Sequence, residues 1–102
     1  MAGGAAPRTR RLVPVMVAGE VYALPAERVR EVVGYSPPSP LPRSEAHVRG
    51  VIDVGGEVVP VVSARVALGL PDAAPTEQTR IVVTDAGGGA TGLVVDAVAG
   101  TV

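Results

Sequence analysis

Valine, glycine and proline are distributed through this chain in a way that limits the elements it can form. Of its 102 residues, 21 are Val and 23 are Gly or Pro. β-Branched Val favours strands, whereas Gly and Pro interrupt regular elements. The sequence therefore predicts a mostly β fold of many short strands joined by turns.

Turn signals between apolar runs place three hairpins. The clearest signal is Gly55-Gly56, because two consecutive glycines suit a tight turn that needs positive φ. The predicted pairs are residues 12–18 with 21–24 around Gly19-Glu20, residues 47–54 with 57–63 around Gly55-Gly56, and residues 79–84 with 91–95 around residues 85–90.

A helix is predicted over residues 25–33. Pro25 suits a first helical position, Ala26, Val29 and Val33 share one helical face, and Gly34 suits a C-terminal cap. Residues 64–70 are expected to form one further helical turn, which Gly69 stops.

The remaining segments are predicted to be irregular. Four prolines in residues 35–42 favour an extended surface connector, and residues 71–78 form a polar loop. Residues 1–11 are expected to be a flexible N-terminal arm, and residues 12–102 a single domain.

Composition narrows the classes of function. A formal net charge of −1 provides no basic field for nucleic acid, and the chain has no Cys, Phe or Trp and only one His, His47. The carboxylates that could in principle pair for acid–base chemistry, Asp53, Glu57, Asp85 and Asp96, are not accompanied by a nucleophile or by metal-ligand spacing. We therefore expect no catalytic residues, no metal, no cofactor, no nucleic-acid partner and no membrane insertion, and a cytoplasmic location.

One motif suggests a remote alternative. Gly87, Gly89 and Gly92 fit the G-x-G-x-x-G pattern of a dinucleotide-binding turn. That site needs a following helix and an acidic residue about 20 positions on, whereas residues 92–95 read as a strand. A mobile hairpin loop is the favoured interpretation.

The order of several dispersed motifs resembles the CheW-like domain. The matching segments are residues 19–24, 29–32, 40–42, 48–52, 56–62, 68–69, 79–83 and 92–98. This resemblance implies two small SH3-like β-barrels with a groove between them. It also implies a non-catalytic adaptor of a bacterial chemosensory array, which links the cytoplasmic coiled-coil tip of a methyl-accepting receptor to the regulatory domain of a histidine kinase or to another CheW-like protein.

Partner contacts are carried over from the resemblance to two regions of this chain. One is the region after the first hairpin and the other is the Gly55-Gly56 hairpin. The candidate residues are Val29, Arg30, Glu31, Val32, Arg49, Gly50, Asp53, Val54, Gly55 and Gly56.

Departures from the family pattern shape the expected function. The family commonly has Asn-Leu-Arg-Gly where this chain has residues 53–56, Asp-Val-Gly-Gly, so an Arg that would pair with Glu31 is missing, and Glu31 is expected to be exposed or paired with Arg28 or Arg49. Ser63 stands where the family commonly has Asp. The chain also stops soon after residues 96–98, which predicts an incomplete second barrel. We therefore expect a receptor-binding adaptor with weakened or absent kinase docking, and an ordinary coupler of receptor and kinase is the alternative.

Overall fold

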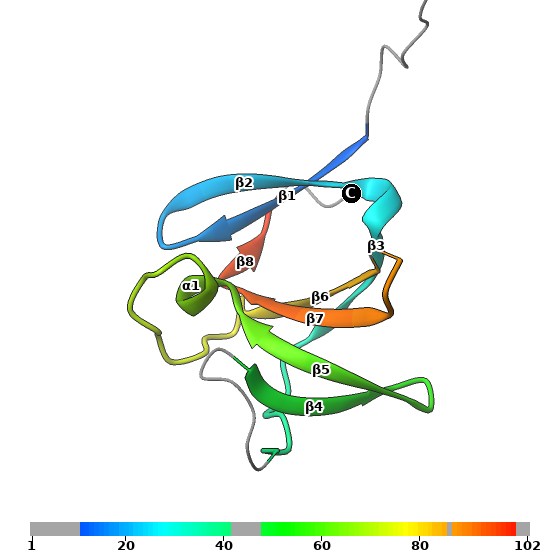
Figure 1. Ribbon diagram of the computed structural model, residues 1–102. Helices are drawn as coiled ribbons and strands as arrows, with labels where there is room; N and C mark the ends of the chain where they lie inside the picture. The colour runs from blue at the N-terminus through cyan, green and yellow to red at the C-terminus, as the bar shows by residue number, and fades with distance from the viewer. Residues whose placement is uncertain (1–10, 42–47, 86, 100–102) are drawn as a thin grey trace, which may run out of the picture.

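A computed structural model describes residues 11–41, 48–85 and 87–99 (Figure 1). The strands are β1 (Leu12–Val17), β2 (Glu20–Pro25), β3 (Val29–Gly34), β4 (Val48–Val54), β5 (Glu57–Ser63), β6 (Arg80–Asp85), β7 (Ala90–Val95) and β8 (Ala97–Val98). A 3-10 turn, η1 (Ala26–Arg28), precedes β3, and one short helix, α1 (Ala64–Ala67), follows β5. The prediction of a mostly β fold with one short helix is confirmed.

The strands form two sheets. A three-stranded sheet has the order β2-β1-β8, and a five-stranded sheet has the order β3-β6-β7-β5-β4. All three predicted hairpins are present as the antiparallel pairs β1–β2, β4–β5 and β6–β7, whereas β5 and β7 pair in parallel. The first turn is centred on Ala18 and Gly19, one residue earlier than predicted.

The predicted helix over residues 25–33 is wrong. Only residues 26–28 are helical, and Val29–Gly34 instead forms β3, which pairs antiparallel with β6. The spacing of Ala26, Val29 and Val33 also fits a strand with a bulge, and the register does shift between Val29 and Glu31. β-Branched valines favour that alternative, and pairing with β6 supplies the backbone partners. The expected helical turn after β5 is confirmed as α1, with Ser63 as its N-cap.

Two apolar clusters lie on opposite faces of the five-stranded sheet. One packs that sheet against β1 and contains Val15, Val17, Ala64, Val82 and Val95. The other is enclosed by the five-stranded sheet and contains Val59, Val83 and Ala90, with Val33, Ile52 and Val54 packed against it. Because the five-stranded sheet buries side chains on both faces, its strands read as nearly continuous apolar runs in the sequence.

The segment after β3 brings the two outer strands of the five-stranded sheet together. Ser39 and Val51 exchange two backbone hydrogen bonds, of 2.8 and 2.9 Å, outside the named strands. This bridge fixes the predicted proline-rich connector against β4. Among the described residues, no helix is long and apolar enough to span a membrane.

Some predictions fall on residues that are not described. His47 lies outside the described residues, as does the predicted N-terminal arm apart from Arg11. The carbonyl oxygen of Arg11 accepts a 2.9 Å hydrogen bond from the backbone N–H of Ala26, so the chain is held against η1 immediately before β1.

Candidate functional site

β3 and the β4–β5 hairpin are joined by a charge pair. The Arg30 guanidinium donates a 3.1 Å hydrogen bond to the Glu57 carboxylate, and both side chains are nearly half exposed. This hydrogen bond is the main reason that the pKa of Arg30 lies above its usual value. The two predicted regions of partner contact therefore meet at this junction, although 27 positions separate the paired residues.

The exposed residues of β3 are the accessible part of the first predicted region. Arg30, Glu31 and Val32 are exposed, and Val32 keeps 37% of its surface accessible. The expected exposure of Glu31 is confirmed. Val29 differs from its neighbours because it is half-buried and packs against the cluster between the two sheets. Its contacts are with the core, so its side chain supports the fold.

The β4–β5 hairpin has a tight turn with its own capping contact. Gly55 and Gly56 have φ of 59° and 90°, as expected for a turn of type I′. The Asp53 carboxylate accepts a 2.8 Å hydrogen bond from the backbone N–H of Gly56. Val54 packs against the cluster inside the five-stranded sheet. Asp53, Gly55 and Gly56 are exposed, whereas Val54 belongs to the core.

The remaining two candidate residues are placed away from this turn. Gly50 is buried, has φ of 143°, and an added Cβ would lie 2.1 Å from the carbonyl oxygen of Ser39. Its role is therefore to let the Ser39 bridge approach β4. Arg49 forms an ion pair with Asp72, in the loop after α1, in place of the pairing with Glu31 that the sequence suggested.

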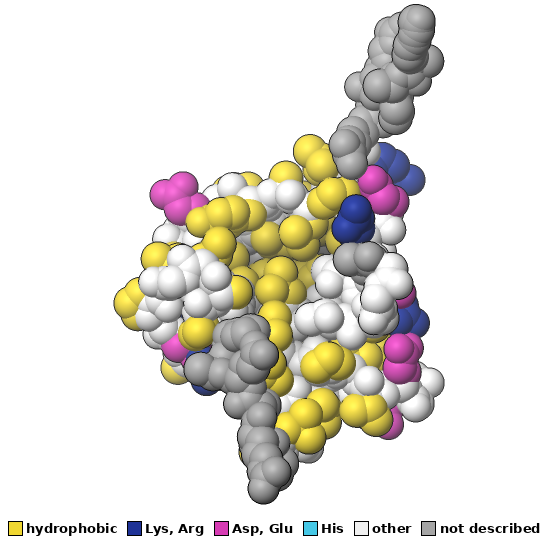
Figure 2. All heavy atoms as spheres, in the orientation of Figure 1, with side chains coloured by type: hydrophobic (Ala, Val, Ile, Leu, Met, Phe, Trp, Pro, Cys, Tyr) yellow, Lys and Arg dark blue, Asp and Glu magenta, His cyan; other side chains and the backbone are white. Residues whose placement is uncertain are grey.

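A cleft with both polar and apolar lining lies beside β3, at the junction of the two sheets. It has a volume of about 490 Å³ and is lined by Met16, Val32, Gln78, Arg80, Ala97, Val98 and Ala99. Hydrophobic side chains gather between the three-stranded and five-stranded sheets on the face in Figure 2. Sequence reasoning identified Val32 but missed Met16 and the residues of β8. The alternation of side chains along β1 could have predicted the position of Met16, since a residue between Val15 and Val17 points to the opposite face of the strand.

The glycine motif of the remote alternative does not form a dinucleotide site. Gly87 and Gly89 lie in the connection between β6 and β7, whereas Gly92 is inside β7. An added Cβ at Gly92 would lie 2.9 Å from the Ile81 side chain, so this glycine allows close packing within the sheet. β7 leads directly into β8, where a dinucleotide site would require a helix.

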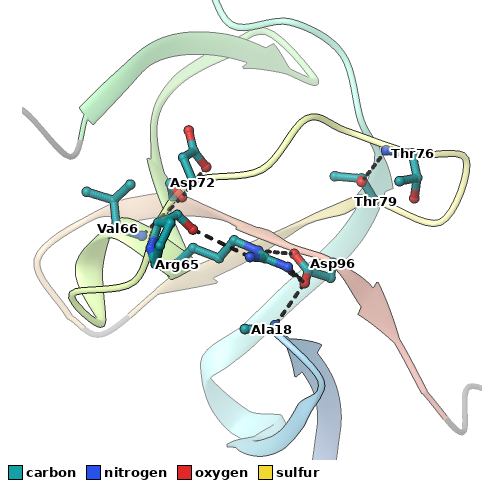
Figure 3. A network of polar contacts seen from close by, with 9 residues as sticks. Ala18, Arg65, Val66, Asp72, Thr76, Thr79 and Asp96 are labelled. Atoms are coloured by element: carbon teal, nitrogen blue, oxygen red, sulfur yellow. Dashed lines mark hydrogen bonds and ion pairs between the residues drawn. The ribbon is translucent and has the colours of Figure 1, made fainter.

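An ion pair fixes the connection between the two sheets. The Arg65 guanidinium of α1 donates hydrogen bonds of 2.6 to 3.2 Å to both carboxylate oxygens of Asp96, which lies between β7 and β8 (Figure 3). Asp96 also accepts a 2.8 Å hydrogen bond from the backbone N–H of Ala18, in the β1–β2 turn. These contacts, the Arg65 hydrogen bond first, hold the pKa of Asp96 below its usual value.

Comparison with known proteins identifies the family. The family model described as the CheW-like domain matches residues 11–102. The chain is 36% identical over 89 residues to the chemotaxis protein CheW of Rhizobium meliloti, covering 87% of this chain and 57% of that protein. It is 33% identical over 73 residues to the chemotaxis protein CheW of Bacillus subtilis, covering 72% of this chain and 47% of that protein.

A solved structure agrees with the sequence relatives. The crystal structure of the scaffolding protein TtCheW from Thermoanaerobacter tengcongensis matches with a TM-score of 0.82 and 28% identity, over 87% of this chain and 61% of that one. The chain thus spans about half the length of the curated relatives it matches. Since the family model covers every described residue, the chain belongs to the CheW-like domain family.

Proposed function

We propose that this chain is a non-catalytic coupling module of a chemosensory system, which binds the cytoplasmic tip of a methyl-accepting receptor and the regulatory domain of a histidine kinase. The observation that carries the proposal is the family match over residues 11–102, together with relatives named chemotaxis protein CheW. The proposal places the chain in the cytoplasm, where those receptor tips lie.

The fold supports a more detailed assignment. We infer that the five-stranded sheet is one SH3-like barrel, since the Ser39–Val51 bridge ties the segment after β3 to β4, and the Arg30–Glu57 pair ties β3 to the β4–β5 hairpin. The three-stranded sheet is then part of a second barrel, and the cleft beside Val32 lies at the junction of the two.

Receptor binding is assigned to this cleft and the exposed residues of β3. The cleft offers apolar surface at Val32 and Met16, and a receptor tip is a coiled coil whose helices can present apolar side chains to such a groove. Glu31 precedes Val32 in β3, and Arg30 lies one residue earlier, paired with Glu57; these exposed charges would set orientation more than affinity.

Kinase binding is assigned to the β4–β5 hairpin. The relatives' names favour an ordinary coupler over an accessory adaptor that has lost kinase docking. One observation favours weaker kinase docking. The hairpin turn contains Gly55 and Gly56 and no Arg, and Glu57, the residue directly after the turn, is paired with Arg30. Affinity for the kinase therefore distinguishes the two roles.

A paired binding titration tests the proposal. The chain is titrated with a purified receptor signalling tip and, separately, with the CheW-like regulatory domain of the kinase. Binding to both supports the coupler, and binding to the receptor alone supports the accessory adaptor. Binding to neither, by a chain whose circular dichroism shows a folded β protein, would refute both roles.

Two matched variants locate the receptor surface. Val32→Lys places a charge in the cleft and is expected to weaken receptor binding at least tenfold. Leu68→Lys is the control, because Leu68 is 49% exposed and lies after α1, outside the residues that line the cleft. Equal losses in the two variants would show that the cleft is not the receptor site.

A further inference from the structure

A small pocket lies where β5 and α1 meet the loop of residues 71–78. Its volume is about 240 Å³, and its polar lining includes Tyr35, Arg49, Ser63, Arg65, Asp72 and Asp96. Pockets for cofactors and drug-sized ligands are usually about 300 to 1,000 Å³. This pocket is therefore suited to one side chain of a partner and is small for a cofactor.

The two carboxylates of the pocket are held in different ways. Asp96 is fixed between β7 and β8 by Arg65 and by the backbone N–H of Ala18. Asp72 belongs to the loop, where residues 71–78 are all exposed and form neither helix nor strand. Its carboxylate accepts a 3.2 Å hydrogen bond from the Ser63 hydroxyl and pairs with Arg49. Of these two carboxylates, only that of Asp72 can move out of the pocket without disturbing a sheet.

The groups around Asp72 would suit another carboxylate equally well. Without Asp72, the pocket keeps two guanidiniums, Arg49 and Arg65, against the single carboxylate of Asp96, so its net charge becomes positive. Ser63 donates to a carboxylate already, and Tyr35 also lines the pocket. The exposed pair of Arg49 with Asp72 is of a kind that contributes little stability, so a competing anion can displace Asp72.

We propose that this pocket binds the carboxylate of an acidic side chain of a partner protein, and that Asp72 is the internal group which that carboxylate displaces. Arg49 and Ser63 supply the charge and the hydrogen bond, and Tyr35 lines the pocket. The Asp72 side chain competes with the partner's carboxylate, so the apparent affinity equals the intrinsic affinity multiplied by the fraction of molecules in which Asp72 has left the site. The inference does not depend on the coupling role.

Side-chain NMR with a minimal probe tests this site. The probe is the capped tripeptide acetyl-Gly-Glu-Gly-amide, and its Gln counterpart is the uncharged control. Titration of the full chain and of Asp72→Asn is followed at the arginine Nε–H and tyrosine ring signals. We expect saturable shifts at Arg49 and Tyr35 with the Glu peptide only, and an affinity on the order of tenfold higher for Asp72→Asn.

Matched variants separate the pocket from general charge effects. Glu57→Gln breaks another exposed Arg–carboxylate pair, outside the pocket, and should leave the affinity unchanged. Arg49→Ala should abolish the shifts of Tyr35 in the otherwise unchanged chain, which provides a test even if Asp72→Asn does not fold. Equal binding of the Gln peptide, an equal gain in Glu57→Gln, or no saturable shift in folded Asp72→Asn would each overturn the proposal.

Discussion

Gly50 shows how a single residue limits the whole β4 strand. Its φ of 143° is unfavourable for an L side chain, and an added Cβ would lie 2.1 Å from the Ser39 carbonyl oxygen. We expect Gly50→Ala to lower the free energy of unfolding by about 2 kcal/mol or more, measured by urea denaturation. Gly34→Ala is the control, because no atom lies within 4 Å of its added Cβ, and a loss of similar size there would contradict this explanation.

The Arg65–Asp96 pair gives a residue-level prediction for pH dependence. The pKa of the Asp96 carboxyl is lowered, mainly by the Arg65 hydrogen bond, from a value near 3.8. A lowered pKa in the folded state means that the pair stabilises the fold above about pH 4, and that this contribution is lost as the pH falls further. Asp96→Asn should cost about 1 to 2 kcal/mol at pH 7, since partial exposure of both side chains screens the attraction.

Stability measured at two pH values checks this prediction. The difference in the free energy of unfolding between the original chain and Asp96→Asn should be largest at neutral pH and should shrink toward pH 3. Glu57→Gln, which breaks the more exposed pair with Arg30, should change stability less at neutral pH. A difference for Asp96→Asn that is constant with pH would show that its carboxylate charge is unimportant.

At the scale of elements, the β4–β5 turn offers a stabilising substitution. Gly55, with φ of 59°, occupies the first central position of a type I′ turn, where Asn is favoured and is less flexible than Gly in the unfolded chain. We expect Gly55→Asn to raise the free energy of unfolding by about 0.5 kcal/mol in urea denaturation. Gly55→Val should lower it, because a β-branched residue resists positive φ. A loss of stability with Asn would contradict the turn assignment.

The sequence predicted the elements that local chemistry defines. All three hairpins follow from apolar runs and turn residues, and α1 follows from its stop at Gly69. The helix over residues 25–33 failed, because the spacing of its apolar residues fits both periodicities and pairing with β6 decided between them.

The candidate site was predicted only in part, for a related reason. The positive φ at Gly55 follows from a local pattern, and the exposure of Glu31 was expected because the Arg that pairs with it in the family pattern is missing. The contact of Arg30 with Glu57 and that of Arg49 with Asp72 join distant parts of the chain, and several acidic residues were equally plausible partners in the sequence. Burial of Gly50 depends on the Ser39 bridge, and no local sequence pattern predicts that bridge.

On the scale of the whole molecule, the shared apolar cluster should make the two sheets unfold together. Val15 of β1 is 1% exposed and belongs to the cluster that also contains Val82 and Val95 of the five-stranded sheet. Val15→Ala should lower the free energy of unfolding by about 2 kcal/mol through lost burial and the cavity it leaves. Because the cluster spans both sheets, the substitution should lower the stability of the two sheets by the same amount.

The two tyrosines can report on the sheets separately, since the chain has no Trp. Tyr22 lies in β2 of the three-stranded sheet, and Tyr35 directly follows β3 of the five-stranded sheet. In single-tyrosine chains made by Tyr35→Phe or Tyr22→Phe, Val15→Ala should move the urea midpoint of fluorescence by the same amount. Val58→Ala, at a 65% exposed position, should move neither. A shift seen by Tyr22 alone would mean that the three-stranded sheet opens independently, and the cleft at the junction would then be absent in part of the folded population.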